Sequence, residues 1–192
     1  MGDELGALEA VLDRVQDALT ERLVGGIMTL DGRPESWGFV GARTRHVLDQ
    51  LQLALRSTAA ARPTFLECGS GFGFVAALAR ELGFRVTGVE VTPGYVAISR
   101  GLFPSVPIEE ADLMTSDRFG DFDVAYYFGP FADDEVQARF ERRLEQDLRP
   151  GGIILANRKV THDWKNGETF ELLSTDGSLF WAIQKRASPG AK

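Results

Sequence analysis

Apolar residues recur every three or four positions at the start of the chain. The members of this series are Leu5, Leu8, Leu12, Val15, Leu19 and Leu23. Because that step puts side chains on one face of an α-helix, it predicts an amphipathic helix over about residues 3–23. A second helix is expected near residues 43–55, before a loop at 57–63. We expect residues 1–45 to form an N-terminal helical cap or lid.

Beyond residue 63, short apolar runs alternate with segments of helical pattern. The expected strands are Phe65–Glu67, Arg85–Val91, Ile108–Ala111, Phe122–Phe128 and Ile153–Ala156. This alternation is typical of an α/β fold with a parallel sheet and helices on both faces. Two further runs, 169–174 and 179–184, flank a Thr-Asp-Gly-Ser turn and predict a C-terminal hairpin, which is antiparallel.

Glycines alternate with other residues where the first of these strands ends. The sequence there is Glu67-Cys68-Gly69-Ser70-Gly71-Phe72-Gly73. It predicts a turn between the strand and a helix that begins at Phe72. Because glycine adopts positive φ and has no side chain, a small molecule can lie directly against this backbone. The dinucleotide fingerprint would need its third glycine at Phe74, so a different ligand is indicated.

Two more acids follow later strands. Glu90 comes 21 positions after Gly69, and an acid about 20 residues past a glycine turn is placed to bind ribose hydroxyls. Asp112 follows the third strand, where it is either a ligand contact or a turn aspartate. The sequence therefore predicts one binding site that draws on three strand ends.

Composition bounds the protein class. The 192 residues, 44% of them apolar, suffice for one compact domain. The sequence contains no apolar run of the roughly 20 residues that a membrane-spanning helix needs. The single cysteine, Cys68, excludes an internal disulfide and favours a reducing cytoplasmic location. We interpret Cys68 as a small apolar filler of the core.

Charge bears on the partners. The net charge is −7, and the basic residues are scattered among more numerous acids. This disfavours nucleic acid as the substrate, since phosphate contacts require a basic surface. An acidic surface would instead attract a basic or cationic substrate.

The motif Glu67 to Gly73 resembles the first motif of class I S-adenosylmethionine-dependent methyltransferases, acid-x-Gly-x-Gly-x-Gly. Leu148-Arg-Pro-Gly-Gly152 is similar to a frequent turn of that family before its fifth strand. The resemblance implies a Rossmann-like, seven-stranded sheet over residues 46–192 as one compact unit. It also implies S-adenosylmethionine as cofactor, with Glu67 and the glycine turn at the methionine end, Glu90 at the ribose and Asp112 at the adenine. The implied cofactor-binding residues are Glu67, Gly69, Ser70, Gly71, Gly73, Glu90, Val91, Asp112 and Leu113.

The methyl acceptor is less directly encoded. The segment 37–48 and the run Phe122–Phe128 resemble small protein-lysine methyltransferases of the ATP synthase c-subunit type, although Gly41 and Ala42 replace a Pro-Thr pair. This implies an amine, such as a protein lysine, as acceptor. Tyr127 and Phe128 are the candidates for acceptor positioning, because they end a strand at the edge where open α/β sheets bind ligands.

Aromatic side chains give independent support for an amine, because ring faces attract cations. Tyr126, Tyr127, Phe128 and Phe131, with Trp37 or Trp164, are candidates for a channel wall. Strand alternation sends Tyr126 and Phe128 to one face and Tyr127 to the other, so all of them cannot line one pocket.

Metal chemistry is not favoured. His46 and His162 are far apart, and no cysteine cluster accompanies them. The magnesium-dependent methyltransferases need several carboxylates and an asparagine, for which Asn157 and Asp163 are the only loose candidates. Two other functions stay open: a methyltransferase of bacterial small-molecule metabolism, and a non-catalytic partner protein that binds S-adenosylmethionine.

Overall fold

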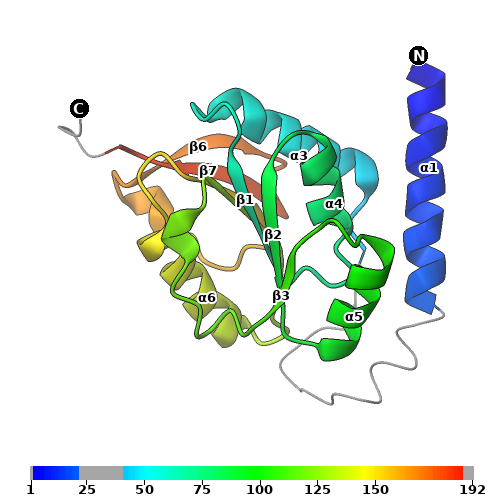
Figure 1. Cartoon of the computed structure of the whole chain (residues 1–192). Helices are drawn as coiled ribbons and strands as arrows, with labels where there is room; N and C mark the ends of the chain where they lie inside the picture. Colours follow the sequence, from blue (N-terminus) through cyan, green and yellow to red (C-terminus); the bar gives the residue numbers. More distant parts are fainter. Residues whose placement is uncertain (1, 22–40, 188–192) are drawn as a thin grey trace.

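The computed structural model describes residues 2–21 and 41–187, with α/β architecture (Figure 1). The helices are α1 (Gly2–Leu19), α3 (Thr44–Ser57), α4 (Phe74–Glu81), α5 (Pro93–Leu102) and α6 (Asp134–Asp147). The strands are β1 (Thr64–Cys68), β2 (Arg85–Glu90), β3 (Ile108–Glu110), β4 (Val124–Phe128), β5 (Ile153–Asn157), β6 (Phe170–Thr175) and β7 (Phe180–Lys185). Two short 3₁₀ helices, Phe119–Asp121 and Asp163–Asn166, complete the set.

The strands form one seven-stranded sheet in the order β3-β2-β1-β4-β5-β7-β6. β1 to β5 are parallel, whereas β7 pairs antiparallel with both β5 and β6. This arrangement confirms the predicted mostly parallel sheet and its antiparallel C-terminal hairpin. The strand order reverses between β1 and β4, and such a switch point leaves room for a ligand at the carboxyl edge.

Helices cover both faces of the sheet (Figure 1). One core lies under α3, α4 and α5 and includes Phe65 and Tyr126. The other lies under α6 and includes Leu66 and Tyr127. Because alternate strand residues point to opposite faces, neighbours in β1 and β4 belong to different cores. The predicted separation of Tyr126 from Tyr127 is confirmed.

The helix after the glycine turn begins at Phe74, two residues later than Phe72, the predicted start. Gly73 has φ +79°, outside the α-helical region, and its N–H donates to Ser70 O at 2.8 Å. The turn therefore continues through Gly73, which caps the helix. Phe72 is instead buried, where its ring packs edge-on against Tyr95 with centroids 5.2 Å apart.

Helix α1 packs against α3 through polar contacts at its C-terminal half. Asp13 Oδ1 accepts hydrogen bonds from Thr44 N at 2.9 Å and Thr44 Oγ1 at 2.8 Å. Helix α1 ends at Leu19. Residues 22–40 lie outside the described residues. The predicted helix end at Leu23 and the candidate wall residue Trp37 fall in that range. A role for residues 1–45 as a lid stays a prediction. Within the described ranges, no helix is long and apolar enough to cross a membrane.

Candidate active site

A cleft opens at the carboxyl edge of the parallel strands. Its lining follows the ends of β1, β2, β3, β4 and β5 and also takes Gln16 from α1. Of the nine residues expected to bind cofactor, all but Gly73 line this cleft. The predicted convergence of three strand ends on one site is therefore observed in the structure.

The glycine turn holds the backbone close to its neighbours. Gly69 and Gly71 have φ of +73° and +52°, values that side-chain-bearing residues rarely adopt. A Cβ on Gly69 would lie 2.9 Å from Cβ of Pro130, in the loop after β4. The N–H groups of Gly69 and Ser70 both donate to Val89 O at 2.9 Å, which fixes the turn against β2.

Gly73 lies behind this surface rather than on it. A Cβ at this position would lie 2.3 Å from Ser99 Oγ of α5. The third glycine therefore permits close packing of α4 and α5, and any effect on a ligand is indirect.

Glu67 is a buried acid at the end of β1, with 4% of its surface exposed. Its Oε2 accepts a hydrogen bond from Ala76 N, in the first turn of α4, at 2.8 Å. Burial raises the pKa of Glu67 well above its ordinary value, the Ala76 N–H lowers it, and the nearby Glu90 raises it further. A cation placed in the cleft would stabilise the ionised form.

Glu90 joins the end of β2 to the glycine turn. Its Oε2 accepts from Gly71 N, and its Oε1 accepts from Val91 N and Thr92 N, all at 2.9 Å. These bonds fix the carboxylate: Oε1 accepts two of them, whereas Oε2 accepts one and keeps a further lone pair for a hydroxyl donor. The fixed acid thus suits a ligand hydroxyl.

Asp112 and Leu113 follow β3 at the far end of the cleft. Asp112 Oδ1 accepts from Met114 N at 2.8 Å, which orients the carboxylate. Leu113 is buried in the core under α6, with 6% of its surface exposed. Together with Ala111 and Met114 they form an apolar wall with one acid, a setting that suits a planar base with an amino group.

The opposite end of the cleft, which we call the β4–β5 end, lies beyond the glycine turn. It is lined by Tyr126, Phe128, Gly129, Pro130, Phe131 and Arg158. Of the two residues proposed for acceptor positioning, Phe128 lines the cleft, and Tyr127 does not. Tyr127 points into the core under α6, where its ring meets Phe140 at a centroid distance of 5.4 Å. Strand alternation explains this, so Tyr127 is corrected to a core residue.

Tyr126, also a candidate wall residue, does line the cleft. Burial raises its pKa above the ordinary value, and the charge of Glu67 adds to this. The phenol therefore stays protonated near neutral pH and cannot act as a base. Trp164, another candidate wall residue, packs on Trp181 in the core under α6, with centroids 5.8 Å apart.

Several lining residues were not predicted. Gln16 of α1 reaches the cleft, and its Nε2 donates to Ala42 O at 3.4 Å. Phe74, Tyr95 and Arg158 also line it. The glycine pattern of the turn could have indicated Phe74, which directly follows the motif, whereas Gln16 reaches the site only through the packing of α1.

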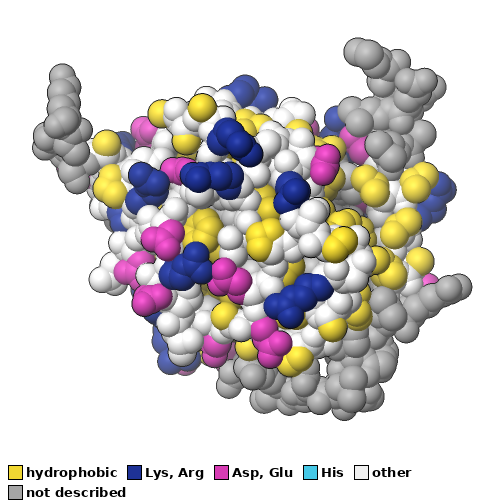
Figure 2. Space-filling model, viewed as in Figure 1, with side chains coloured by type: hydrophobic (Ala, Val, Ile, Leu, Met, Phe, Trp, Pro, Cys, Tyr) yellow, Lys and Arg dark blue, Asp and Glu magenta, His cyan; other side chains and the backbone are white. Residues whose placement is uncertain are grey.

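The surface has no basic stripe on the face drawn in Figure 2, where acidic and basic side chains of the described residues are interspersed. Among those same residues, no group of three or more His, Cys, Asp or Glu side chains is arranged to hold a metal ion.

Comparisons with known proteins agree with this geometry. A family model described as a methyltransferase domain matches residues 66–156, from β1 to the end of β5. No curated protein matches the sequence.

Solved structures with the same fold include three methyltransferases. An RNA methyltransferase from Salinibacter ruber, in complex with S-adenosyl-L-homocysteine, is 19% identical, with a TM-score of 0.61 over 80% of this chain and 98% of its own. A putative S-adenosyl-L-methionine-dependent methyltransferase from Methanococcus maripaludis is 14% identical, with a TM-score of 0.56 over 93% of this chain and 94% of its own. The ribosomal protein L11 methylase of Lactobacillus delbrueckii subsp. bulgaricus is 14% identical, with a TM-score of 0.54 over 74% of this chain and 80% of its own.

The matched segment contains the glycine turn, Glu90 and Asp112, and the sheet around it has the strand order reported above. Residues 66–156 thus match the methyltransferase domain family, and the chain has the fold of S-adenosylmethionine-dependent methyltransferases.

Proposed function

We propose that this enzyme transfers a methyl group to an amine, such as the side chain of a protein lysine. The hydrogen bond of Gly71 N to Glu90 Oε2 carries the cofactor part of the proposal, because it joins the glycine turn and the acid assigned to the ribose in one cleft. In this arrangement the glycine turn and Glu67 hold the methionine portion, Glu90 the ribose hydroxyls, and Asp112 with Leu113 the adenine.

The cleft fits such a ligand on chemical grounds. Its turn has no side chains at Gly69 and Gly71, so a ligand can lie against the backbone. Ser70 Oγ is buried and has no hydrogen-bond partner in the described structure, so it is available to a ligand. When bound, S-adenosylmethionine supplies a methyl group on a sulfonium, which an electron pair can displace in line.

The β4–β5 end supports an amine as the electron-pair donor. Phe128, Gly129, Pro130 and Phe131 offer no side chain that accepts a proton, and the guanidinium of Arg158 has only hydrogen-bond donors. An alcohol with a high pKa would need a base there. An amine, with a pKa near 10.4, loses its proton more easily because burial in a pocket disfavours the charged form.

The chain then contributes orientation and exclusion of water. Phe128 and Phe131 surround the amine with apolar surface, and a ring face attracts the amine as it enters charged. Holding donor and acceptor in line converts their encounter into a step within one complex, which is the main rate advantage available to this site.

Two experiments test the proposal. Calorimetry with S-adenosylhomocysteine should give micromolar binding, with NADH as the matched control ligand; selective binding of NADH would contradict the cofactor assignment. Incubation with a methyl-labelled cofactor and host lysate should label protein, and hydrolysis should recover the label in methyllysine. Label that enters only the small-molecule fraction would exclude the protein acceptor, and an absence of transfer despite binding would indicate a non-catalytic partner protein.

A further inference from the structure

Arg158 is the only basic side chain among the described residues that line the cleft. The three acids of the lining, Glu67, Glu90 and Asp112, lie at the strand ends assigned to the cofactor. Arg158 lies at the β4–β5 end, together with Phe128 and Phe131. The single cation is thus at the end of the cleft where the acceptor enters.

The backbone of Arg158 is held in an unusual conformation. Its φ of +58° is the only positive value among the described residues other than glycine. Such a conformation is unfavourable for a residue with a side chain and persists only where the surroundings enforce it. Its own N–H donates to Leu179 O at 2.7 Å, which ties this residue to the chain just before β7.

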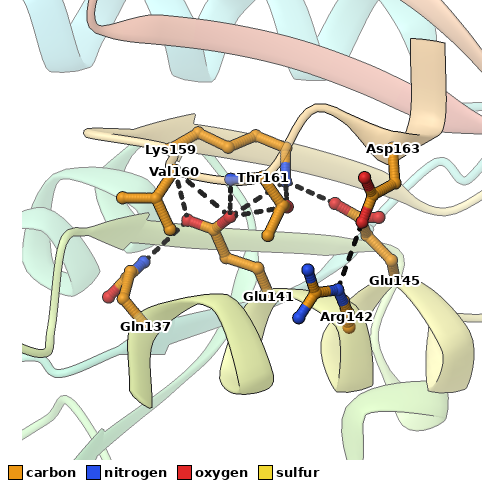
Figure 3. A network of polar contacts seen from close by, with 8 residues as sticks. All are labelled: Gln137, Glu141, Arg142, Glu145, Lys159, Val160, Thr161 and Asp163. Carbon is orange, nitrogen blue, oxygen red and sulfur yellow. Dashed lines mark hydrogen bonds and ion pairs between the residues drawn. The ribbon is translucent and has the colours of Figure 1, made fainter. Parts of the chain in front are cut away.

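The residues after Arg158 are fixed by one buried carboxylate, that of Glu141 in α6 (Figure 3). Its oxygens accept from Val160 N at 3.0 Å, and from Thr161 N at 2.8 Å and Thr161 Oγ1 at 2.7 Å. Lys159 Nζ donates to Glu141 Oε2 at 3.2 Å and also bonds Glu145. Side-chain exposure is 0% for Glu141 and 1% for Lys159, so this ion pair is shielded from solvent.

The same carboxylate reaches the loop after β4 through Gln137. Gln137 Nε2 donates to Glu141 Oε1 at 2.8 Å, and Gln137 Oε1 accepts from Phe131 N at 3.2 Å. The loops after β4 and β5, which bracket the acceptor end, are therefore both anchored on Glu141. This explains how the strained backbone of Arg158 is maintained.

Gly129 makes room for the Arg158 side chain. A Cβ on Gly129, which has φ +44°, would lie 3.2 Å from Arg158 Cβ and 3.3 Å from Arg158 Cδ. A second cavity shares Gly129, Phe131 and Arg158 with the cofactor cleft and continues past Asp134 toward exposed Leu179. Arg158 thus lines both cavities, and Asp134 is the acidic residue of the second one.

We propose that Arg158 is a specificity-determining residue that binds a carboxylate on the methyl acceptor, next to the amine to be methylated. The inference rests on the proposed transfer to an amine and extends it to the class of acceptor: a lysine flanked by an acidic residue. A guanidinium matches the planar geometry of a carboxylate with two parallel hydrogen bonds. Its positive charge also lowers the pKa of a neighbouring amine and so favours the neutral, nucleophilic form.

The test uses two short peptides that differ only beside their single lysine, with Glu in one and Gln in the other. Calorimetry measures their binding to the protein saturated with S-adenosylhomocysteine, and a labelled methyl donor measures their turnover. The wild-type protein should bind the Glu peptide about tenfold more tightly, the value expected for a charge-assisted hydrogen bond. Arg158→Gln should bind both peptides equally, and Arg158→Glu should prefer a third peptide with Lys at that place.

The outcomes separate the two proposals. Equal binding of both peptides to wild type, or binding of neither, would overturn the role of Arg158. A loss of S-adenosylhomocysteine affinity in Arg158→Gln would also overturn it, because the residue would then bind the cofactor. A charge preference without any methyl transfer would retain the carboxylate site and reject the amine acceptor. Thermal unfolding of each variant checks that the loop is intact.

Discussion

The backbone N–H of Gly71 donates to Oε2 of Glu90 across 2.9 Å, linking the glycine turn to the end of the neighbouring strand. The same carboxylate accepts two further N–H groups, from Val91 and Thr92. Three fixed donors hold the acid in position, so a ligand does not have to order the side chain. Preorganisation of this kind lowers the cost of binding.

Replacing Glu90 with alanine should weaken S-adenosylhomocysteine binding about tenfold or more. The hydrogen bond from a ribose hydroxyl to Oε2 is lost, which contributes roughly 1.5–3 kcal/mol, and Gly71 N of the turn loses its acceptor. Calorimetry at neutral pH measures the change. Glu171→Ala, which removes an exposed acid on the edge strand β6, is the matched control and should bind as wild type does. An affinity loss below threefold in Glu90→Ala would contradict the ribose assignment.

Gly73→Ala should destabilise the fold more than Gly83→Ala does. Both glycines have positive φ, +79° and +98°, so both substitutions strain the backbone. Only at Gly73 does the new methyl group collide with another side chain, Ser99, whereas nothing lies within 4 Å at Gly83. Overpacking adds about 1–3 kcal/mol. Urea unfolding of the two variants isolates this difference, and equal losses would refute the packing role of Gly73.

The spacing of residues predicted that three acids meet at one edge of the sheet, because each of them is local to a strand end. Glu67, Glu90 and Asp112 each follow an apolar run, and parallel strands bring such ends to one edge. The period of 2 also predicted that Tyr126 and Tyr127 face opposite ways. It could not say which face would become the cleft, since that depends on where α6 packs, and Tyr127 was misplaced for this reason.

The acceptor end depends on long-range contacts that no local pattern records. Arg158 follows β5 as an ordinary charged residue; its N–H is bonded to Leu179 O, and Glu141 holds the residues that follow it. Likewise, Gln16 reaches the cleft because α1 packs on α3, as the bonds between Asp13 and Thr44 show. Sequence periodicity predicts that α1 is a helix but not the surface against which it packs.

Cofactor binding should release protons through Glu67. Burial raises its pKa above the ordinary value of 4.5 in the free protein. A bound sulfonium and ammonium favour the ionised carboxylate and lower that pKa, so the complex holds fewer protons than the free protein does. Affinity should therefore rise as pH increases from about 4.5 through the raised pKa, by linkage.

Calorimetry in two buffers with different ionisation enthalpies counts the protons released on binding. Glu67→Gln keeps an acceptor for Ala76 N but cannot ionise, so its binding should be weaker and independent of pH over this range. Identical proton release by wild type and Glu67→Gln would assign the proton to another group and reject the prediction.

Lys159→Met should cost about 3–5 kcal/mol of unfolding free energy at pH 7, because it leaves the buried charge of Glu141 without its partner (Figure 3). The matched control is Arg142→Met, because Arg142 lies beside Glu141 in α6 and forms an exposed ion pair with Asp163. Removing this ion pair should cost less than about 1 kcal/mol. Urea unfolding measures both variants, and equal losses would show that the buried pair contributes no more than a surface one.

The pH dependence gives this last prediction a sign. In wild type, burial raises the pKa of Glu141. The charge of Lys159 and the hydrogen bonds lower this pKa, and the net shift is downward. Its contribution to stability is therefore present above the unfolded-state pKa and is lost as pH falls through the folded one. In Lys159→Met, burial persists without the cation, so protonation of Glu141 relieves the uncompensated charge. The difference in unfolding free energy between wild type and Lys159→Met should therefore shrink as the pH falls from 7 to about 4.5. A difference that grows on acidification would show that Glu141 is not the group left unpaired.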